Sequence, residues 1–521
     1  MDSDGDSLRS VLHLCRRNLS RKGPIDVGLA LSGNEPDHPL SEEPSFAMNI
    51  SRRTFAQGVV TILGGLALPG DLFADAGRAN LRFAVLSDIH IGGRKTAEAN
   101  LEKTLRWLTT QHLDAIVSPG DIAHSGYIHQ IEAFAAIWNR VFPEGKDADG
   151  RKVELMISTG NHDVAAHWVK GTPEWRAEHV LAHGDNLAKV WERLFREKWE
   201  LVWHKRVKGY SFVGSQWGGL KPPVEAFFAA HADELKGSKP FFYVQHAVPK
   251  GTCAGCSAGS SDDGSSTRAL TPFPNAVAIS GHSHLTPADE RVMWQGAFTS
   301  FGAGCLHEGG YPFKDAAGDD YQNGGAFWMG DFKYRKMAPI NDPDAWGGDP
   351  SGAAFLIVDV HDDHLVVDRR SVLHGCPIGP AWVVPLPAKT GGPFDLEKRT
   401  AQLKAPEFPE NARLVVETLP DGSPLAAPSL KKKPCVCVTF PHVRTVPGGA
   451  RVFDYVVTAE GSGKKVVRKI LADGFCCPEP LADRPGRCLF FADELPADVR
   501  YTVTPRDSFG HTGKAITGGI S

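Results

Sequence analysis

The chain has 521 residues, which is more than one ordinary hydrophobic core accommodates, so we expect two domains with additional segments. A formal net charge of −4 provides no overall basic field and argues against a stable nucleic-acid partner. No stretch of the sequence has the roughly 18 consecutive apolar residues of a membrane-spanning helix, so we expect no stable membrane partner either.

The N-terminal region carries the three parts of an export signal. Ser51-Arg52-Arg53-Thr54-Phe55 precedes a moderately apolar stretch at residues 58–70, and Ala74-Asp75-Ala76 follows as a small-x-small cleavage site. The adjacent arginines followed by Phe resemble a twin-arginine signal, which implies a partnership with the export machinery and a periplasmic or secreted protein. The alternative interpretation is a buried N-terminal helix.

The position of Met48 suggests where this signal starts, because it lies three residues before Ser51. We therefore place the twin-arginine-type signal at residues 48–76. Residues 1–47 are expected to be a disordered extension or the result of a mis-assigned gene start.

From residue 81 to about residue 376, apolar strands alternate with amphipathic helical segments. The predicted strands span residues 81–87, 113–118, 153–158, 240–244 and 275–280, and the predicted helices span residues 96–111, 128–142 and 224–235. Strands that are apolar on both faces and separated by helices indicate an α/β fold with a sheet covered on both sides. Functional residues of such folds gather at the carboxyl ends of the strands.

Five short motifs, each directly after one of these strands, contain side chains that bind metals. They are Asp88-Ile89-His90, Gly120-Asp121, Gly160-Asn161-His162-Asp163, Gln245-His246 and Gly281-His282-Ser283-His284. Apart from Gln245, they supply three carboxylates, one amide and five imidazoles. This is the ligand chemistry of a hydrolytic site in which two cations ~3.5–4 Å apart clamp a phosphoryl group and hold a hydroxide for in-line attack.

The motifs can be divided between the two metals. Asp88 and His90, two residues apart at one strand end, can bind the same metal, and Asp121 is the natural bridge between the metals. Asn161 contributes a neutral oxygen. The remaining imidazoles, which complete both coordination shells, belong to His246, His282 and His284. A mixed oxygen and nitrogen set suits Mn, Fe or Zn, and the glycines of the motifs allow tight turns at the strand exits.

In order and spacing the motifs resemble those of the calcineurin-like metallophosphoesterase superfamily, D-x-H, G-D, G-N-H-(D/E), H and G-H-x-H, over roughly residues 81–376. The resemblance implies a four-layer αββα sandwich and two divalent or trivalent metal ions. The ligand sets it implies are Asp88, His90, Asp121 and His284 on one metal and Asp121, Asn161, His246 and His282 on the other. It also implies that His162 stabilises the transition state or protonates the leaving oxygen, while Asp163 orients the His162 imidazole.

Residues near the second motif distinguish branches of this superfamily. Protein Ser/Thr phosphatases read G-D-x-V-D-R-G, whereas this chain has His124 and Gly126 after Gly120-Asp121. Purple acid phosphatases have Tyr and Gly where this chain has His124 and His90. The pattern is closest to cyclic-nucleotide and glycerophosphodiester phosphodiesterases. His124 either contacts substrate or supports other groups as a capping residue; nucleases also carry His there, which keeps nuclease activity as a further alternative.

Two long segments and one turn complete the first domain. Residues 251–274, rich in Gly, Ser and Asp, predict a mobile loop beside the site, and residues 309–350 predict a second long surface loop. Residues 355–360 and 365–370 predict a β-hairpin around His361-Asp362-Asp363-His364. Although this turn has metal-binding residue types, we interpret it as a plain polar turn.

A Pro-rich stretch separates this domain from a C-terminal region of short alternating runs. We place the catalytic domain at residues 77–380, the linker at residues 381–409 and a small all-β domain at residues 410–521. The runs that predict its β-sandwich span residues 413–417, 435–440, 451–458, 465–471, 489–491 and 500–504. Residues 501–510 resemble the last strand and turn of a fibronectin type III or Ig-like module.

These features predict an exported dimetal phosphoesterase that hydrolyses a small phosphodiester or phosphomonoester by metal-bound hydroxide attack. One alternative is a phosphomonoesterase of the acid-phosphatase or nucleotidase type. An alternative of a different class is an exported, non-catalytic binding protein in which the β-sandwich binds the ligand. The complete set of ligand residues argues against this last hypothesis.

Overall fold

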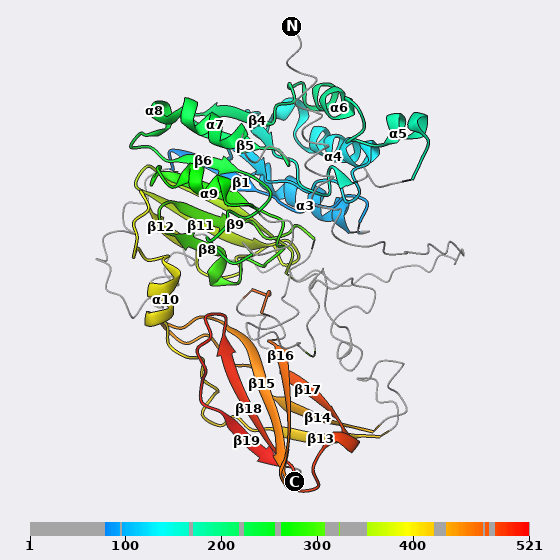
Figure 1. The fold of residues 1–521 in the computed structure, drawn as a ribbon, viewed down its shortest axis with the longest axis vertical. Helices are drawn as coiled ribbons and strands as arrows, with labels where there is room; N and C mark the ends of the chain where they lie inside the picture. The colour runs from blue at the N-terminus through cyan, green and yellow to red at the C-terminus, as the bar shows by residue number, and fades with distance from the viewer. Residues whose placement is uncertain are drawn as a thin grey trace.

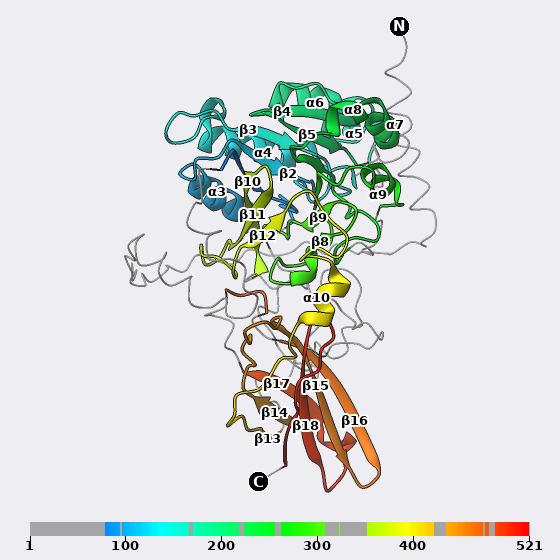
Figure 2. The ribbon, with the colours of Figure 1, turned by 90° about the vertical axis from the view of Figure 1, so that its left-hand side faces the viewer.

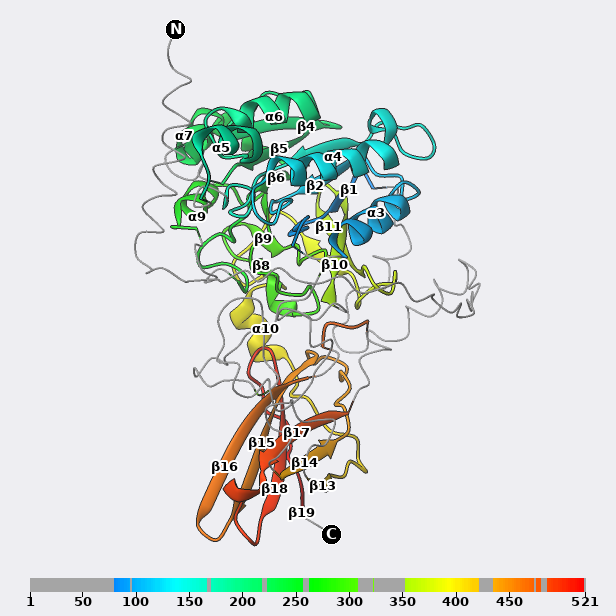
Figure 3. The ribbon, with the colours of Figure 1, turned by 90° about the vertical axis from the view of Figure 1, so that its right-hand side faces the viewer.

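The computed structural model describes residues 79–93, 96–165, 170–217, 223–255, 262–307, 322, 352–420, 434–472, 475–478 and 485–519. The predicted extension, the predicted export signal and nearly all of the predicted loop at residues 309–350 lie outside these residues. An α/β body and a β body lie at opposite ends of the molecule (Figures 1, 2 and 3). Within the described part of the chain, no helix is long and apolar enough to cross a membrane.

The first sheet of the α/β body has six strands in the order β12-β11-β10-β1-β2-β3. Its strands are β1 (Leu81–Val85), β2 (Ala115–Ser118), β3 (Glu154–Ile157), β10 (Ala354–His361), β11 (His364–Ser371) and β12 (Trp382–Pro385). The first three strands are parallel to one another, and the last three add to them in antiparallel fashion. The predicted hairpin is confirmed as β10 and β11.

The second sheet also has six strands, in the order β4-β5-β6-β7-β9-β8. Its strands are β4 (Val202–Val207), β5 (Tyr210–Ser215), β6 (Phe241–Val244), β7 (Ala276–Ser280), β8 (Met293–Gln295) and β9 (Thr299–Gly302). Its inner strands are parallel and its two edge strands are antiparallel. The five strands predicted from apolar runs are confirmed, but they divide between two mixed sheets rather than forming one.

Successive side chains along a strand point to opposite faces of its sheet, and this alternation allows each sheet to pack between the other sheet and a layer of helices. In β1, Phe83 and Val85 face the second sheet, whereas Ala84 faces the helices on the outer side. The Phe83 ring packs edge-on against Phe212 and Phe242 of the second sheet, at centroid distances of 5.4 and 4.9 Å. Full burial of such a side chain stabilises the fold by roughly 1.5–3 kcal/mol, so the contact between the sheets is a main core of this body.

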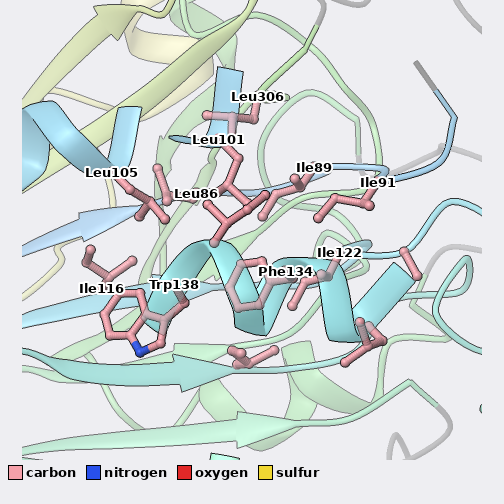
Figure 4. Packing of buried hydrophobic residues seen from close by; sticks show 14 of the residues in the cluster. Leu86, Ile89, Ile91, Leu101, Leu105, Ile116, Ile122, Phe134, Trp138 and Leu306 are labelled. Atoms are coloured by element: carbon pink, nitrogen blue, oxygen red, sulfur yellow. The ribbon is translucent and has the colours of Figure 1, made fainter. Parts of the chain in front are cut away.

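Helices cover the two outer faces. On the first sheet these are α3 (Ala97–Leu108), α4 (Ile128–Val141) and α6 (Asn186–Phe195), and on the second they are α7 (Pro223–Ala230), α8 (Ala232–Leu235) and α9 (Ser265–Leu270). Figure 4 shows Leu101 and Leu105 of α3 packing with Leu86 and Ile89, and Phe134 and Trp138 of α4 beside Ile116 and Ile122. The four-layer αββα arrangement implied by the resemblance is therefore present.

The C-terminal region forms two antiparallel sheets around one apolar cluster, as expected for an all-β domain. One sheet contains β13 (Val415–Leu419), β14 (Cys435–Phe440) and β17 (Gly486–Phe491), and the other contains β15 (Val452–Gly461), β16 (Lys464–Leu471), β18 (Arg500–Asp507) and β19 (Ile516–Gly519). A fibronectin type III or Ig-like identity stays a prediction.

Two segments are more ordered than the sequence predicted. The expected linker at residues 381–409 contributes β12 to the first sheet and contains helix α10 (Leu396–Gln402), so the first domain extends beyond residue 380. The expected loop at residues 251–274 contains α9, with Cys253 and Asp262 buried. Both corrections have the same cause, because tertiary packing orders short polar segments that have no periodicity of their own.

Three arginines lie where the α/β body meets the β body, and Arg369 and Arg451 are buried. Arg451 of the β body donates to the Ile378 carbonyl at 3.0 Å, and Arg399 of α10 pairs with Glu290 at 2.7 Å. Arg369 of β11 pairs with the same Glu290 at 2.8 Å. Glu290, Arg369 and Arg399 all belong to the α/β body and the segment that follows it, so among these three contacts only the bond from Arg451 to Ile378 joins the two bodies.

Candidate metal centre

All five motifs meet at the carboxyl ends of β1, β2, β3, β6 and β7, at one edge of the two sheets. Backbone hydrogen bonds continue the sheets into the motifs. The amide of Asp88 donates to the Gly120 carbonyl at 3.0 Å, and the amide of Gly281 donates to the His246 carbonyl at 3.0 Å. The motif side chains are therefore carried on segments fixed by their neighbours rather than on free loops.

The side chains form two buried groups, each able to place its ligand atoms around one ion. The first consists of Asp88, His90 and His284, and the second consists of Asp121, His246 and His282. In the first group His284 Nε2 lies 3.1 Å from Asp88 Oδ1 and 3.1 Å from His90 Nε2. In the second group His246 Nε2 lies 3.0 Å from Asp121 Oδ2.

Asp121 connects the two groups. Its Oδ2 atom, close to His246 of the second group, is also 3.7 Å from His90 Nε2 of the first. Asp88 likewise has its Oδ1 atom 3.9 Å from His246 Nε2. A carboxylate between two ligand groups is the arrangement that two neighbouring cations require.

The ligand-bearing residues have an unusual backbone conformation. Positive φ angles of 52°, 53°, 55°, 69° and 53° occur in order at Asp88, His90, Asp121, His282 and His284. Only a few per cent of non-glycine residues adopt this left-handed region, and such residues cluster at functional sites where the surrounding structure holds them. The conformation turns successive side chains toward the same edge.

The glycines of the motifs allow close approach of the strand exits. A Cβ atom on Gly160 would lie 2.1 Å from Asp121 Oδ1, and a Cβ atom on Gly281 would lie 2.0 Å from Ser87 Oγ. Gly120 has a φ of 121°, and its Cβ would lie 2.6 Å from the Gly160 amide nitrogen. Any side chain at these positions would push the ligands apart.

Asn161 and His246 each present an atom that suits a metal ligand. Asn161 Oδ1 is buried and has no hydrogen-bond partner among the described residues, which suits an oxygen that faces a cation. His246 Nδ1 donates to the Pro119 carbonyl at 3.1 Å, which leaves Nε2 as the ring atom that faces Asp121. Metal-binding histidines are commonly held by such a bond through the other ring nitrogen.

The electrostatics keep the carboxylates charged. Burial alone would raise the pKa of Asp88, but the charge and hydrogen bond of His284 hold this pKa below its ordinary value. Burial likewise opposes ionisation of Asp121, yet His246 and His162 keep its pKa low. Burial, together with the neighbouring histidines, lowers the pKa of His90 well below its ordinary value. At His246 burial acts in the same direction, but Asp121 and Asp88 raise the pKa to about 9.

His162 lies beside both groups, with its ring centroid 4.6 Å from that of His90. Its backbone amide donates to Asp121 Oδ1 at 2.8 Å. Its Nδ1 atom donates to the His124 carbonyl at 2.6 Å. Because a carbonyl only accepts, Nδ1 carries a proton and Nε2 is the atom that can act on a substrate.

The Asp163 carboxylate has three backbone partners, and its predicted role of orienting His162 stays a prediction. The carboxylate is fully buried and accepts from three backbone amides, those of Ala123 at 2.7 Å, Asp121 at 3.0 Å and Gly160 at 2.8 Å. It therefore joins the exits of β2 and β3, while the His124 carbonyl accepts from His162 Nδ1. Burial and the charge of Asp121 raise the pKa of Asp163 to about 7, although the backbone amides act in the opposite direction.

Other residues near the groups were only partly foreseen. His124 Nδ1 lies 3.3 Å from His90 Nδ1, in a position to support that ring from behind. Three residues outside the motifs also approach the site, namely Trp217, Cys305 and His307. His307 and Cys305 follow β9, a strand not predicted because its residues, Thr299–Gly302, have only one large apolar side chain. In the sequence, the only sign of these two residues was the run Gly-Cys-Leu-His at residues 304–307, shortly after this strand.

Comparisons with known proteins agree with the motifs. Residues 81–285 match the family model of the calcineurin-like phosphoesterases. No curated protein sequence matches the chain. Similar solved structures include a dimetal phosphatase from Danio rerio, 9% identical over 59% of this chain and 99% of that chain, with a TM-score of 0.36.

A purple acid phosphatase from yellow lupin, Lupinus luteus, is 14% identical over 58% of this chain and 53% of that chain, with a TM-score of 0.37. A predicted phosphoesterase from Streptococcus pneumoniae is 10% identical over 58% of this chain and 97% of that chain, with a TM-score of 0.26. Similarities this low add nothing to the family match and the buried ligand groups. On those two grounds, residues 81–285 belong to the calcineurin-like metallophosphoesterase superfamily.

Proposed function

We propose that this protein is an exported dimetal enzyme that hydrolyses small phosphate esters, either phosphodiesters or phosphomonoesters. The observation that carries the proposal is the pair of buried His/Asp groups joined by Asp121. Their mixed oxygen and nitrogen atoms suit Mn, Fe or Zn. Two such ions, when bound, supply a Lewis acid for the phosphoryl group and an activated water.

Each side chain has a separate task in this proposal. Asp88, His90 and His284 would hold one ion, and Asp121 could serve both ions. Three further side chains would hold the second ion, namely Asn161, His246 and His282. His162 faces the substrate through Nε2 and stabilises the developing charge or gives a proton to the leaving oxygen, because its Nδ1 is fixed by the His124 carbonyl. Asp163 holds the loops that carry these groups.

The cyclic-nucleotide and glycerophosphodiester phosphodiesterases are the proposed branch, on the pattern around His90, His124 and Gly126. A phosphomonoesterase of acid-phosphatase or nucleotidase type uses the same metal chemistry and is the second candidate. Nuclease activity is a further candidate, because nucleases of the superfamily also carry a His at the position of His124. The hypothesis of a non-catalytic binding protein is less well supported, since every ligand of both groups is in place.

Substrate panels and metal analysis test this function. We expect the purified full chain to hold about two metals and to cleave at least one ester in a panel of aryl phosphomonoesters, aryl phosphodiesters, cyclic nucleotides, glycerophosphodiesters and single-stranded oligonucleotides. The panel is run with Mn, Fe, Zn and Ca in turn. Protein that lacks about two bound metals and stays inactive with added Mn would instead favour the binding hypothesis.

The proposed export has its own test. If residues 48–76 are a twin-arginine signal, the native product begins close after Ala76, and replacing both Arg52 and Arg53 with Lys retains the precursor inside the cell. N-terminal sequencing of the secreted or periplasmic protein measures the first expectation, and cell fractionation measures the second. A mature start well upstream of Ala76 would contradict the signal.

A further inference from the structure

The segment after β9, residues 303–307, is a sixth strand exit at the edge where the five motifs meet. Its backbone is fixed at two points: the amide of Ala303 donates to the Ser280 carbonyl at 2.7 Å, and the amide of Leu306 donates to the Ser87 carbonyl at 3.0 Å. These partners lie just before the His282–His284 motif and the Asp88–His90 motif. The segment lies outside the matched residues 81–285.

Within this segment, Cys305 contacts two members of the first metal group. Its side chain is fully buried, and Sγ donates to the Asp88 carbonyl at 3.2 Å. The same thiol is hydrogen-bonded to the His284 imidazole. A thiol can donate one hydrogen and accept another, so both bonds can exist together.

We propose that Cys305 is a positioning residue, which fixes the His284 ring and the Asp88 backbone so that this group can bind its metal. The inference rests on the proposed dimetal function and deepens it. A histidine ligand commonly donates its other ring N–H to a carboxylate or a carbonyl, and the proposal gives this supporting role for His284 to the Cys305 thiol.

The backbone conformation of Asp88 and His284 explains why a supporting contact from Cys305 is needed. Asp88 and His284 have φ angles of 52° and 53°, so each needs surrounding contacts to remain in the left-handed region. The two residues come from segments far apart in the sequence and meet at His284 Nε2 and Asp88 Oδ1, 3.1 Å apart. One thiol behind both residues holds this pair together.

The test compares Cys305→Ala with Cys305→Ser in the full chain by calorimetric titration with Mn²⁺ alone. We expect Cys305→Ala to weaken one of the two Mn²⁺ affinities by about 10- to 100-fold, the usual effect of losing a partner behind a metal ligand, and to leave the other affinity unchanged. Cys305→Ser should recover part of the loss, because a hydroxyl can also donate and accept but reaches less far.

Cys253→Ala is the matched control. Cys253 is also fully buried, and its sulfur contacts Thr252 and Ser300 at 4.0 and 3.9 Å, so its truncation leaves a similar cavity. Circular dichroism checks the fold of every variant, and Cys305→Ser serves alone if Cys305→Ala does not fold. We expect Cys253→Ala to keep both wild-type affinities.

The outcomes separate the two proposals. Wild-type Mn²⁺ affinities in Cys305→Ala, equal losses in the Ala and Ser variants, or an equal loss in Cys253→Ala would each overturn the positioning role. A wild-type protein that binds none of Mn²⁺, Fe²⁺ and Zn²⁺ would overturn the dimetal function itself. A selective loss at one site with partial recovery by Ser supports the inference.

Discussion

Two regions of the first domain are rich in His and Asp, and only one has the geometry of a metal centre. At the strand-exit edge, Asp88 and Asp121 are at most 1% exposed and are surrounded by imidazoles from distant strands. In the turn between β10 and β11, Asp363 is 84% exposed and pairs with the adjacent His364 at 2.7 Å. The same residue types therefore serve different purposes in the two places.

The difference lies in where the partners come from. In the turn, the rings of His361 and His364 stack at 4.6 Å, and Asp362 accepts a hydrogen bond from Tyr210, so local and structural contacts use these side chains. At the edge, parallel strand ends bring together side chains from segments far apart in the chain and bury them. Residue composition alone cannot make this distinction, whereas strand topology can.

The largest effect should come from removing the shared carboxylate. We expect Asp121→Ala to abolish turnover and metal binding, with activity below about one-hundredth of wild type, because it removes a ligand rather than a supporting partner. Metal analysis and hydrolysis of the best ester measure this. Asp363→Ala in the turn is the matched control, and a comparable loss there would contradict the distinction between the two regions.

The next effect should come from His162. We expect His162→Ala to retain both metals but lose ~10²-fold or more in rate, as for a lost general acid or charge-stabilising group. Metal content and kcat are measured together. If His162→Ala loses metal, the residue is a ligand; if His364→Ala loses as much rate, the assay does not report on the site.

A smaller effect should follow from widening the strand exits. We expect Gly160→Ala to destabilise the fold by about 1–3 kcal/mol and to weaken Mn²⁺ binding, since its Cβ would lie 2.1 Å from Asp121 Oδ1. Gly237→Ala is the control, because the nearest atom to its Cβ is 3.8 Å away. Thermal unfolding measures the stability of both variants, and Mn²⁺ titration measures their affinities. Identical results for the two variants would contradict a close approach of Gly160 to Asp121.

The smallest effect concerns a third His–Asp pair, outside the first domain. His511 donates from Nδ1 to Asp507 at 2.7 Å and from Nε2 to the Thr400 carbonyl of α10 at 2.7 Å, so it is doubly protonated. Burial opposes this charge, but the hydrogen bond and charge of Asp507 raise the pKa of His511 above its ordinary 6.5.

The sign of its pH dependence follows from this raised pKa. Stabilisation by His511 is fully present below pH 6.5 and is lost as the pH rises through the higher folded-state value. We expect wild type to lose about 1 kcal/mol or less relative to His511→Ala over this range. Parallel unfolding curves from pH 6 to 9 measure the difference, and a constant gap between the two proteins would contradict the charged pair.

The sequence was sufficient to locate the chemistry because apolar strands and their polar exits are local patterns. Asp88, His90, Asp121, Asn161, His246, His282 and His284 could all be named as candidate ligands from five motifs. The strands before the motifs appear within a few residues of their predicted bounds. Similar periodicity located the strands of the C-terminal region, although not what that region binds.

Which strands pair in a sheet, and which residues hold the metal ligands in place, depends on contacts between residues far apart in the chain. Only the tertiary structure decided these contacts. Apolar runs could not show that β1 and β6 belong to different sheets, since both are buried on both faces. Nor could a motif show that Asp163 binds three backbone amides or that Cys305 lies behind Asp88. The sequence specifies the type of each side chain. Which residue that side chain contacts depends on how the ends of separate strands come together in the fold.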